Sequence, residues 1–316
     1  MNREEMLNAT ESLLKNAGFK ISRRCSARPS CFCMIARKSS NLVLIKVLSD
    51  LGKITLRDAL ELRTISSVLR ATPLFIAGNS RDRPLEDDTI YSRYDICALT
   101  LGTLEDVVSG GMSPLVEAGP GGYYVRLDGE LIRSQRTKLG LSSGKVAEQL
   151  GISKRTLYGY ENGMAKASVS AAYNLEWMLG VPLVKSIDVF KPVQIDGGFF
   201  AAAKRFIIRN RFLQTVLKQL ILSDFKVAAT TRAPFDFIAQ PPNGNINIIG
   251  GVTEPGEINI NLRAEEIITI SDVAEAKPVF ITDGKLAPNN NIPLIQSSEL
   301  EKTQLAIDLF LREVTR

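Results

Sequence analysis

The 316-residue chain contains no histidine, four cysteines and a single tryptophan. The lack of histidine excludes Ser-His-Asp and Cys-His nucleophiles, histidine-ligated zinc or haem, and imidazole-based pH switches. No apolar run approaches 18 residues, and the mixed-charge start, MNREEMLNATESLLKNAGF, has no signal-peptide core. We therefore expect a cytoplasmic chain without a membrane span. Any catalysis has to use carboxylates, lysine, tyrosine, cysteine or a bound metal.

The charge balance is only mildly basic. There are 39 Lys plus Arg against 34 Asp plus Glu, a formal net charge of +5. Such an excess permits a polyanionic partner without proving one, so the distribution of the charges matters more than their sum. The length suggests about two domains, at roughly 150 residues per domain.

An internal repeat sets the expected architecture. Residues 64–76 (TISSVLRATPLFI) and 269–281 (TISDVAEAKPVFI) are identical at eight of 13 positions without a gap. The flanks agree as well, because CFCMIAR (31–37) matches PFDFIAQ (234–240). The same module therefore occurs twice.

Each copy is expected to contain the same helices and strands. The expected helices lie at about 2–17, 55–71, 204–223 and 263–276. The expected strands lie at 19–24, 32–37, 41–48 and 73–77, and at 225–230, 235–240, 245–251 and 278–282. A last short strand and helix close each copy. Helices flanking a mostly buried sheet form an α/β module of roughly 110 residues.

The segment between the copies has a different amino-acid composition. SGGMSPLVEAGPGG (109–122) is rich in glycine and proline and lacks the pattern of a phosphate-binding loop, so we interpret it as a connector. We divide the chain into a first copy at 1–108, a linker at 109–129, a helical insert at 130–190 and a second copy at 191–316.

Four short helices are expected in the insert. Ser142 or Ser143 caps the second helix, and Ser153 caps the third, at 153–162. Ile132, Arg136 and Leu139 form one face of the first helix. In the third helix, the core-facing side consists of Leu157, Tyr160 and Glu161. The opposite side consists of Lys154, Arg155, Tyr158, Gly159 and Asn162. Two cations at a helix N-terminus oppose the helix dipole, so this side favours an anionic partner.

The stretch LIRSQRTKLGLSSGKVAEQLGISKRTLYGYENG (131–163) resembles the XRE family, the Cro/C1-type helix-turn-helix of phage repressors. The resemblance implies a helix-turn-helix motif at 143–162 whose recognition helix, 153–162, enters the major groove. It also implies a structural ion pair between Arg136 and Glu161. The residues implied to contact DNA are Ser143, Lys154, Arg155, Thr156, Tyr158, Gly159 and Asn162. Ser143 is shorter than the glutamine common at that position. Residues 130–166 hold seven basic and three acidic residues, so most of the net charge lies here.

The repeated module resembles the restriction-endonuclease-like fold, whose active site needs an Asp and a (D/E)xK triplet that together hold Mg²⁺. In the first copy Cys33 stands at the Asp position, and the triplet is Leu44-Ile45-Lys46. In the second copy Asp236 is present, but the triplet is Ile248-Ile249-Gly250. We therefore expect a retained fold without catalytic residues or metal ligands. The alternative is carboxylate migration, with ligands from Asp50, Glu61, Glu254 or Glu257.

Cys25, Cys31 and Cys33 do not have the spacing of a standard zinc or iron–sulfur site. Neighbouring arginines could lower a thiol pKa and support redox or metal sensing. The alternative is that these are core or loop thiols without chemistry.

The order of copy, insert and copy resembles archaeal HTH-type transcriptional regulators over essentially the whole chain. The resemblance implies a sequence-specific DNA-binding regulator that is not an enzyme and uses no cofactor. It also implies a homodimer on two half-sites of double-stranded DNA, with the nuclease-like modules as dimerisation or sensing surfaces for a small-molecule or redox effector. A metal-dependent nuclease and an antitoxin-like protein-interaction module remain the alternatives.

Overall fold

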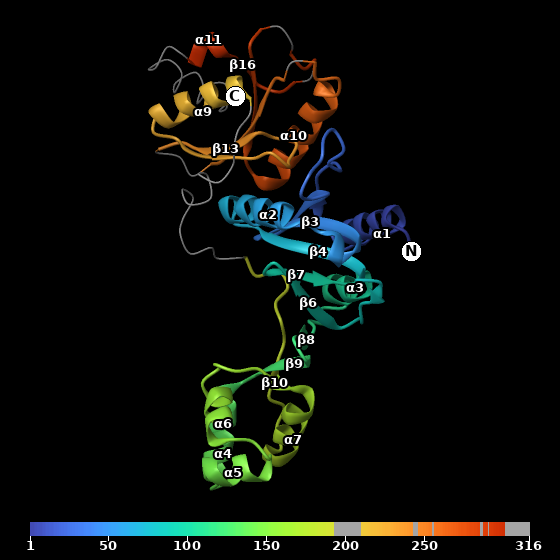
Figure 1. Cartoon of the computed structure of the whole chain (residues 1–316), viewed down its shortest axis with the longest axis vertical. Helices are drawn as coiled ribbons and strands as arrows, with labels where there is room; N and C mark the ends of the chain where they lie inside the picture. The colour runs from blue at the N-terminus through green and yellow to red at the C-terminus, as the bar shows by residue number, and fades with distance from the viewer. Residues whose placement is uncertain (193–209, 243–245, 255, 285–286, 290, 301–316) are drawn as a thin grey trace. The chain divides into compact units, whose positions relative to one another are not determined.

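The computed structural model describes residues 1–192, 210–242, 246–254, 256–284, 287–289 and 291–300 (Figure 1). The chain divides into two compact units. One consists of Met1–Ile76 with Phe190–Arg316, and the other of Ala77–Val189. Within the described ranges, no helix is long and apolar enough to cross a membrane.

The first copy begins the larger unit. Its elements there are α1 (Arg3–Asn16), β1 (Lys20–Ile21), β2 (Met34–Lys38), β3 (Asn41–Asp50), the 3₁₀ turn η1 (Leu51–Lys53), α2 (Leu56–Leu69) and the start of β4 (Thr72–Ser80). Strands β1 and β3 both pair antiparallel with β2. Residues 42–45 of β3 are all buried, which is why this strand is a continuous apolar run in the sequence rather than an alternating one.

The second copy repeats the first. Its elements are α9 (Arg211–Leu222), β12 (Lys226–Ala229), β13 (Phe237–Gln240), β14 (Ile248–Val252), α10 (Ile260–Ala274), β15 (Lys277–Thr282), β16 (Leu294–Gln296) and α11 (Ser297–Leu300). The sheet order is β12-β13-β14-β15-β16, with antiparallel pairs up to β14 and parallel pairs after it. Residues 204–209 of the expected helix at 204–223, and residues 301–316, lie outside the described residues.

Strand register fixes which residues of the two copies are equivalent. Met34 pairs with Ile45, and Phe237 pairs with Gly250. Cys33 and Asp236 are therefore equivalent, as the sequence suggested. The counterpart of Lys46 is one residue later than expected, at Gly251, so the second triplet is 249–251. The connection at 241–247 is much longer than the turn between β2 and β3, and matching sequences alone could not set its register.

The two copies contact each other within the larger unit. The Cys31 N–H donates to the Arg232 carbonyl at 2.7 Å. The rings of Phe32 and Phe235 lie 6.3 Å apart, each at the same place in its own copy. The Arg37 guanidinium donates to the carbonyl of Val273 in α10 at 2.6 Å.

The smaller unit contains the end of the first copy and the helical insert. Its strands are the end of β4, β5 (Arg83–Pro84), β6 (Thr89–Arg93), β7 (Ile96–Leu99), β8 (Val116–Gly119), β9 (Gly122–Leu127), β10 (Ala167–Ser168) and β11 (Val184–Lys185). Its helices are α3 (Leu101–Ser109), α4 (Gly129–Lys138), α5 (Ser143–Gln149), α6 (Lys154–Glu161) and α7 (Val169–Leu179).

Residues 116–127, expected to belong to a linker, form the hairpin β8–β9 instead. Strand β9 pairs antiparallel with β10 and with β11. Val125 and Leu127 are buried in the same cluster as Ile132 and Leu157, so the hairpin completes the core of the helical insert. The last three of the glycines that suggested a connector lie at the hairpin turn, where Gly121 has a φ of 84°.

Candidate nucleic-acid interface

Short helices α4 to α7 build the helix-turn-helix, and serine caps set where three of them, α5, α6 and α7, begin. The Ser142 side chain accepts from the Lys145 N–H at 3.1 Å, and Ser153 accepts from the Thr156 N–H at 3.0 Å. Of the two serines considered for the second helix, Ser142 is therefore the cap. Ser143 is the first helical residue and is exposed.

The inner face of α6 is as the sequence predicted. Leu157, Tyr160 and Glu161 are buried. Arg136 Nε donates to Glu161 Oε1 at 2.6 Å, which confirms the expected ion pair between α4 and α6. Leu139 differs from the expectation, because its side chain is 51% exposed and does not join the inner face of α4.

The outer face of α6 begins with two cations. Lys154 and Arg155 are exposed in its first turn. An added Cβ at Gly144 would lie 3.0 Å from Lys154 Cε, so the glycine in α5 makes room for the lysine side chain. Tyr158 follows one turn later and is 58% exposed.

Gly159 does not lie on this outer face, so that prediction is wrong. Gly159 is buried, and its carbonyl accepts from the N–H groups of Met164 and Ala165 at 2.8 and 3.2 Å. An added Cβ would lie 3.1 Å from the Ala165 Cβ. The missing side chain makes room for the turn after α6 rather than for DNA.

Two other predicted contact residues already have partners in the fold. The Thr156 hydroxyl lies 2.8 Å from the Ser153 hydroxyl in the helix cap. Asn162 ends α6, where its amide donates to the Tyr158 carbonyl at 2.7 Å and accepts from Arg133 at 2.9 Å. Thr156 is half-buried, whereas Asn162 is exposed.

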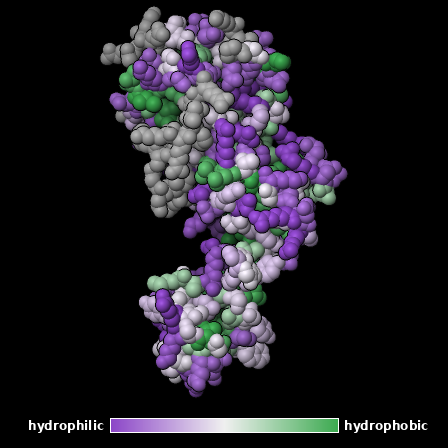
Figure 2. All heavy atoms as spheres, in the orientation of Figure 1, coloured by the Kyte–Doolittle hydropathy of each residue, from purple (hydrophilic) through white to green (hydrophobic). Residues whose placement is uncertain are grey.

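Four of the seven basic residues in 130–166 have no carboxylate partner in the part of the chain that the structure describes. They are Lys138, Lys145, Lys154 and Arg155, and all four are exposed. The remaining three pair with Glu161 or Glu117. Hydrophilic residues accordingly line the edge formed by α4, α5 and α6 (Figure 2). Lys138 is the last residue of α4 and Lys145 lies in the first turn of α5, outside the set of DNA contacts that the resemblance implies.

The positions that correspond to the nuclease aspartate, Cys33 and Asp236, differ between the copies in their surroundings. Cys33 Sγ accepts from the Val47 N–H at 3.4 Å, just as Asp236 Oδ2 accepts from the equivalent Val252 N–H at 2.6 Å. Asp236 also binds Arg28 Nη2 at 2.5 Å and the guanidinium of Arg263.

These partners leave no room for Mg²⁺ at Asp236. Arg263 is fully buried, and burial alone would lower its pKa, but the carboxylates of Asp236 and Glu257 raise that pKa above its ordinary value. Glu257 pairs with Arg263 at 2.9 Å, and Glu254 lies 3.4 Å from Arg28. The lysine position of the triplet is also blocked, since an added Cβ at Gly251, the counterpart of Lys46, would lie 2.6 Å from the Phe280 ring.

The other two carboxylates considered as alternative metal ligands, Glu61 and Asp50, also have hydrogen-bond partners. Glu61 binds backbone N–H groups of the second copy, and Asp50 caps η1 at 2.5 Å from the Gly52 nitrogen. Among the described residues, no group of three or more Cys, Asp or Glu side chains could hold a metal ion. The residues present do not fit a magnesium site.

The four cysteines are free thiols. Burial, and secondarily the charge of Glu266, raises the pKa of Cys25 well above its usual value. Burial and the charge of Glu61 do the same for the pKa of Cys31. These directions oppose the thiolate that redox sensing would need.

Comparison with known proteins agrees with this architecture. Residues 3–114 match the PD-(D/E)XK superfamily domain, and residues 132–185 match a helix-turn-helix domain. No solved structure matches the chain.

Relatives in archaea match the chain over nearly its full length. A protein of Methanocaldococcus jannaschii is 31% identical over 97% of this chain and 95% of its own. A protein of Methanocella arvoryzae is 34% identical over 98% of this chain and 95% of its own length. A protein of Pyrococcus furiosus is 30% identical over 96% of this chain and 95% of its own length. All three are named as HTH-type transcriptional regulatory proteins. The chain belongs to this archaeal family of DNA-binding HTH-type transcriptional regulators.

Proposed function

We propose that α6 reads operator DNA in the major groove. The observation that carries this proposal is the exposed first turn of α6, where Lys154 and Arg155 lack a carboxylate partner within the described ranges. Cations there oppose the helix dipole, so a base edge or phosphate would offset a local cost. We assign base contacts to Lys154 and Arg155, because recognition helices of this type read bases from their N-terminal residues.

Residues around α6 would position the helix on the duplex. Lys138 and Lys145 are exposed and suit phosphate contacts, which supply most non-specific affinity. Ser143 and Tyr158 are also exposed and would contact the sugar-phosphate backbone of the DNA. Thr156 and Asn162 would contribute less to DNA binding, since both already have hydrogen-bond partners in the fold.

We further propose that two chains bind two half-sites as a homodimer joined through α7. Val169, Tyr173 and Trp177 are one helical turn apart, and they are 45%, 65% and 82% exposed. A two-fold operator needs a self-complementary contact close to the recognition helices, and α7 belongs to the same unit. The nuclease-like copies already pair with each other within one chain, which favours α7 over them as the dimer contact.

The nuclease-like copies would then act as a non-catalytic scaffold of a cytoplasmic regulator. The observation in favour is the pairing of Asp236 with Arg28 and Arg263, where a nuclease would need metal. A basic guanidinium held against the carboxylate competes directly with a cation for the same oxygens.

One selection experiment tests this function. The full chain is mixed with fragmented genomic DNA of its host, with and without Mg²⁺ or Mn²⁺, and the bound fragments are sequenced. We expect a shared palindromic sequence and intact DNA in both arms. Metal-dependent cleavage that Asp236→Asn abolishes would establish a nuclease instead. No enriched sequence, together with a tight protein partner, would establish an interaction module.

A further inference from the structure

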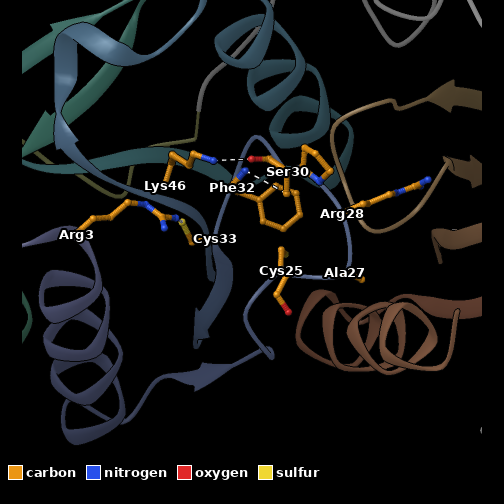
Figure 3. Close-up of a pocket in the computed structure, with 10 residues that line it drawn as sticks. Arg3, Cys25, Ala27, Arg28, Ser30, Phe32, Cys33 and Lys46 are labelled. Atoms are coloured by element: carbon orange, nitrogen blue, oxygen red, sulfur yellow. Dashed lines mark hydrogen bonds between the residues drawn. The ribbon is translucent and has the colours of Figure 1, made fainter. Parts of the chain in front are cut away.

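The vestigial nuclease site of the first copy contains a cavity of about 430 Å³. Its wall consists of the loop at 25–30 together with Arg3, Phe32, Cys33 and Lys46, all within the larger unit (Figure 3). This size is within the range of small-molecule sites. The matching region of the second copy is occupied instead by Arg263, which is fully buried against Asp236.

The charge of this cavity is opposite to that of a metal site. Three cations line it, Arg3, Arg28 and Lys46, and no carboxylate is among its lining residues. Arg28 extends away from the cavity toward the second copy, where it pairs with Asp236 (Figure 3). Arg3 and Lys46 have no carboxylate partner in the described part of the chain.

Lys46 and Arg3 are both held in place by hydrogen bonds, and both keep N–H groups that a ligand could accept from. Lys46 Nζ donates to the Ser30 carbonyl at 2.5 Å, which leaves two of its three N–H groups. Arg3 donates to the Val47 carbonyl at 3.2 Å and to Cys33 Sγ at 3.3 Å. An oxyanion between them would gain charge-assisted hydrogen bonds from groups already in position.

The replacement of Asp by cysteine explains why the cavity is lined by cations rather than by carboxylates. At the equivalent place in the second copy, the Asp236 carboxylate neutralises two guanidinium groups. In the first copy the neutral thiol of Cys33 stands there, while the cation at Lys46 remains. Removing the metal-binding carboxylate and keeping the lysine leaves a site that favours an anion.

We propose that this cavity binds a small molecule that carries a phosphate or carboxylate group and acts as the effector of the regulator. The ligand would touch the loop at 25–30, whose residues 26 and 27 donate backbone N–H groups to Glu266 of the second copy. Binding would therefore act on the contact between the two copies. Only the effector role rests on the proposed function.

Calorimetry on the full chain tests the site directly. The probes are inorganic phosphate, glycerol 3-phosphate and succinate, titrated at constant ionic strength set with chloride. We expect saturable binding of at least one probe. Tighter binding of glycerol 3-phosphate assigns the ligand to phosphate esters, and tighter binding of succinate assigns it to carboxylates. No saturable binding, or binding of DNA alone, would overturn the proposal.

Charge-changing variants with matched controls locate the binding. Lys46→Met should weaken it by about 10-fold or more, through loss of a charged donor. Lys53→Met removes an exposed lysine outside the cavity and should leave it unchanged. Cys33→Asp restores a carboxylate next to Arg3 and should abolish binding, whereas Cys33→Ser should retain it. The site would be refuted if Lys46→Met and Lys53→Met changed the probe affinity equally, and Cys33→Asp and Cys33→Ser did so too. Each variant must also show the thermal melt of a folded protein.

The effector role is read separately, as the affinity for the selected operator with and without the bound probe. We expect a change of about 5-fold or more. An unchanged operator affinity would refute the effector role. Loss of operator binding in Arg155→Ala, with calorimetry unaffected, keeps a failure of DNA recognition distinct from a failure of the anion site.

Discussion

Glu61 of α2 and Glu266 of α10 hold the opposite nuclease-like copy through equivalent hydrogen bonds. Glu266 accepts from the backbone N–H groups of residues 26 and 27 at 2.7 and 2.9 Å. Glu61 accepts from the N–H groups of residues 231 and 232, the latter at 2.5 Å. Both carboxylates are fully buried. The repeat thus forms a pseudo-symmetric pair inside one chain.

Replacing either glutamate should destabilise the larger unit. Glu61→Gln and Glu266→Gln each remove the charge from a buried acceptor of several hydrogen bonds, so we expect a loss of about 1.5–3 kcal/mol in the free energy of unfolding. Urea denaturation measures this loss. Glu275→Gln is the control, because the Glu275 side chain is 71% exposed and its ion pair with Arg37 should contribute less than about 1 kcal/mol. A control loss equal to that of Glu61→Gln would contradict the buried contact.

The thiols of Cys25, Cys31 and Cys97 should react slowly with alkylating reagents. Burial raises the pKa of Cys97 to about 12 and the pKa values of Cys25 and Cys31 well above their usual range. A raised pKa leaves these thiols protonated at pH 8, so we expect iodoacetamide labelling at least about 10-fold slower than in the urea-unfolded chain. Mass spectrometry of the labelled peptides resolves each site. Rapid labelling of Cys25 in the folded chain would restore the redox-sensing hypothesis.

Asp128 links the stability of the helical insert to pH. The hydrogen bond from the Leu131 N–H, and then the Lys185 ammonium, lower the Asp128 pKa below its usual value of 3.8. A lowered pKa in the folded state stabilises the fold above the unfolded pKa, and the effect is lost as pH falls through the folded pKa. Asp128→Asn should therefore be less stable than the parent at pH 7, and the difference should shrink below about pH 4.

Thermal melts of parent and variant between about pH 2.5 and 7 check this dependence. Asp106→Asn, an aspartate within α3 rather than at its cap, is the matched control and should show a much smaller difference at pH 7. A difference between parent and Asp128→Asn that stays constant down to the lowest pH would rule out the titration of Asp128 as its cause.

Local patterns predicted most of the fold. The helix caps at Ser142 and Ser153, the inner face of α6 and the order of elements in both copies follow from short-range periodicity and capping, which the sequence displays directly. The pairing of Arg136 with Glu161 could be expected only through the family resemblance, since these residues are distant in sequence.

Long-range packing limited the remaining predictions. Gly159 is glycine because the turn at 163–165 folds back on it, which helix periodicity cannot reveal. The hairpin at 116–127 is stabilised by pairing with β10 and β11, whose residues follow it by about 40 to 70 positions. The ion pair at Asp236 likewise depends on Arg28 of the other copy, a partner that no local motif contains.

Basic residues of the helix-turn-helix should separate into two classes. Lys154→Ala and Arg155→Ala should each weaken operator binding by about 1–3 kcal/mol and relax base preference, because they remove base contacts. Lys145→Ala should weaken operator and random DNA alike and reduce the salt slope by about 0.9, because it removes one phosphate contact. Fluorescence anisotropy at several salt concentrations measures both quantities.

A matched control for these lysines is Lys166→Ala, since Lys166 pairs with Glu117. It should leave base preference and the salt slope close to those of the parent. If Lys154→Ala and Lys166→Ala behaved alike, α6 would not be the element that reads the operator.

Trp177 offers a direct readout of the proposed dimer, because it is the single tryptophan of the chain and its side chain is 82% exposed. If α7 joins two chains, acrylamide should quench its fluorescence less at high protein concentration, as the partner helix covers the indole. Sedimentation should show a dimer that Trp177→Ala weakens by about 10-fold or more, since buried aromatic residues dominate such interfaces. Ile258→Ala, which truncates a 93% exposed apolar residue elsewhere, should not alter the association. A monomer bound to the operator at working concentration would exclude the dimer, and a dimer insensitive to Trp177→Ala would place its contact outside α7.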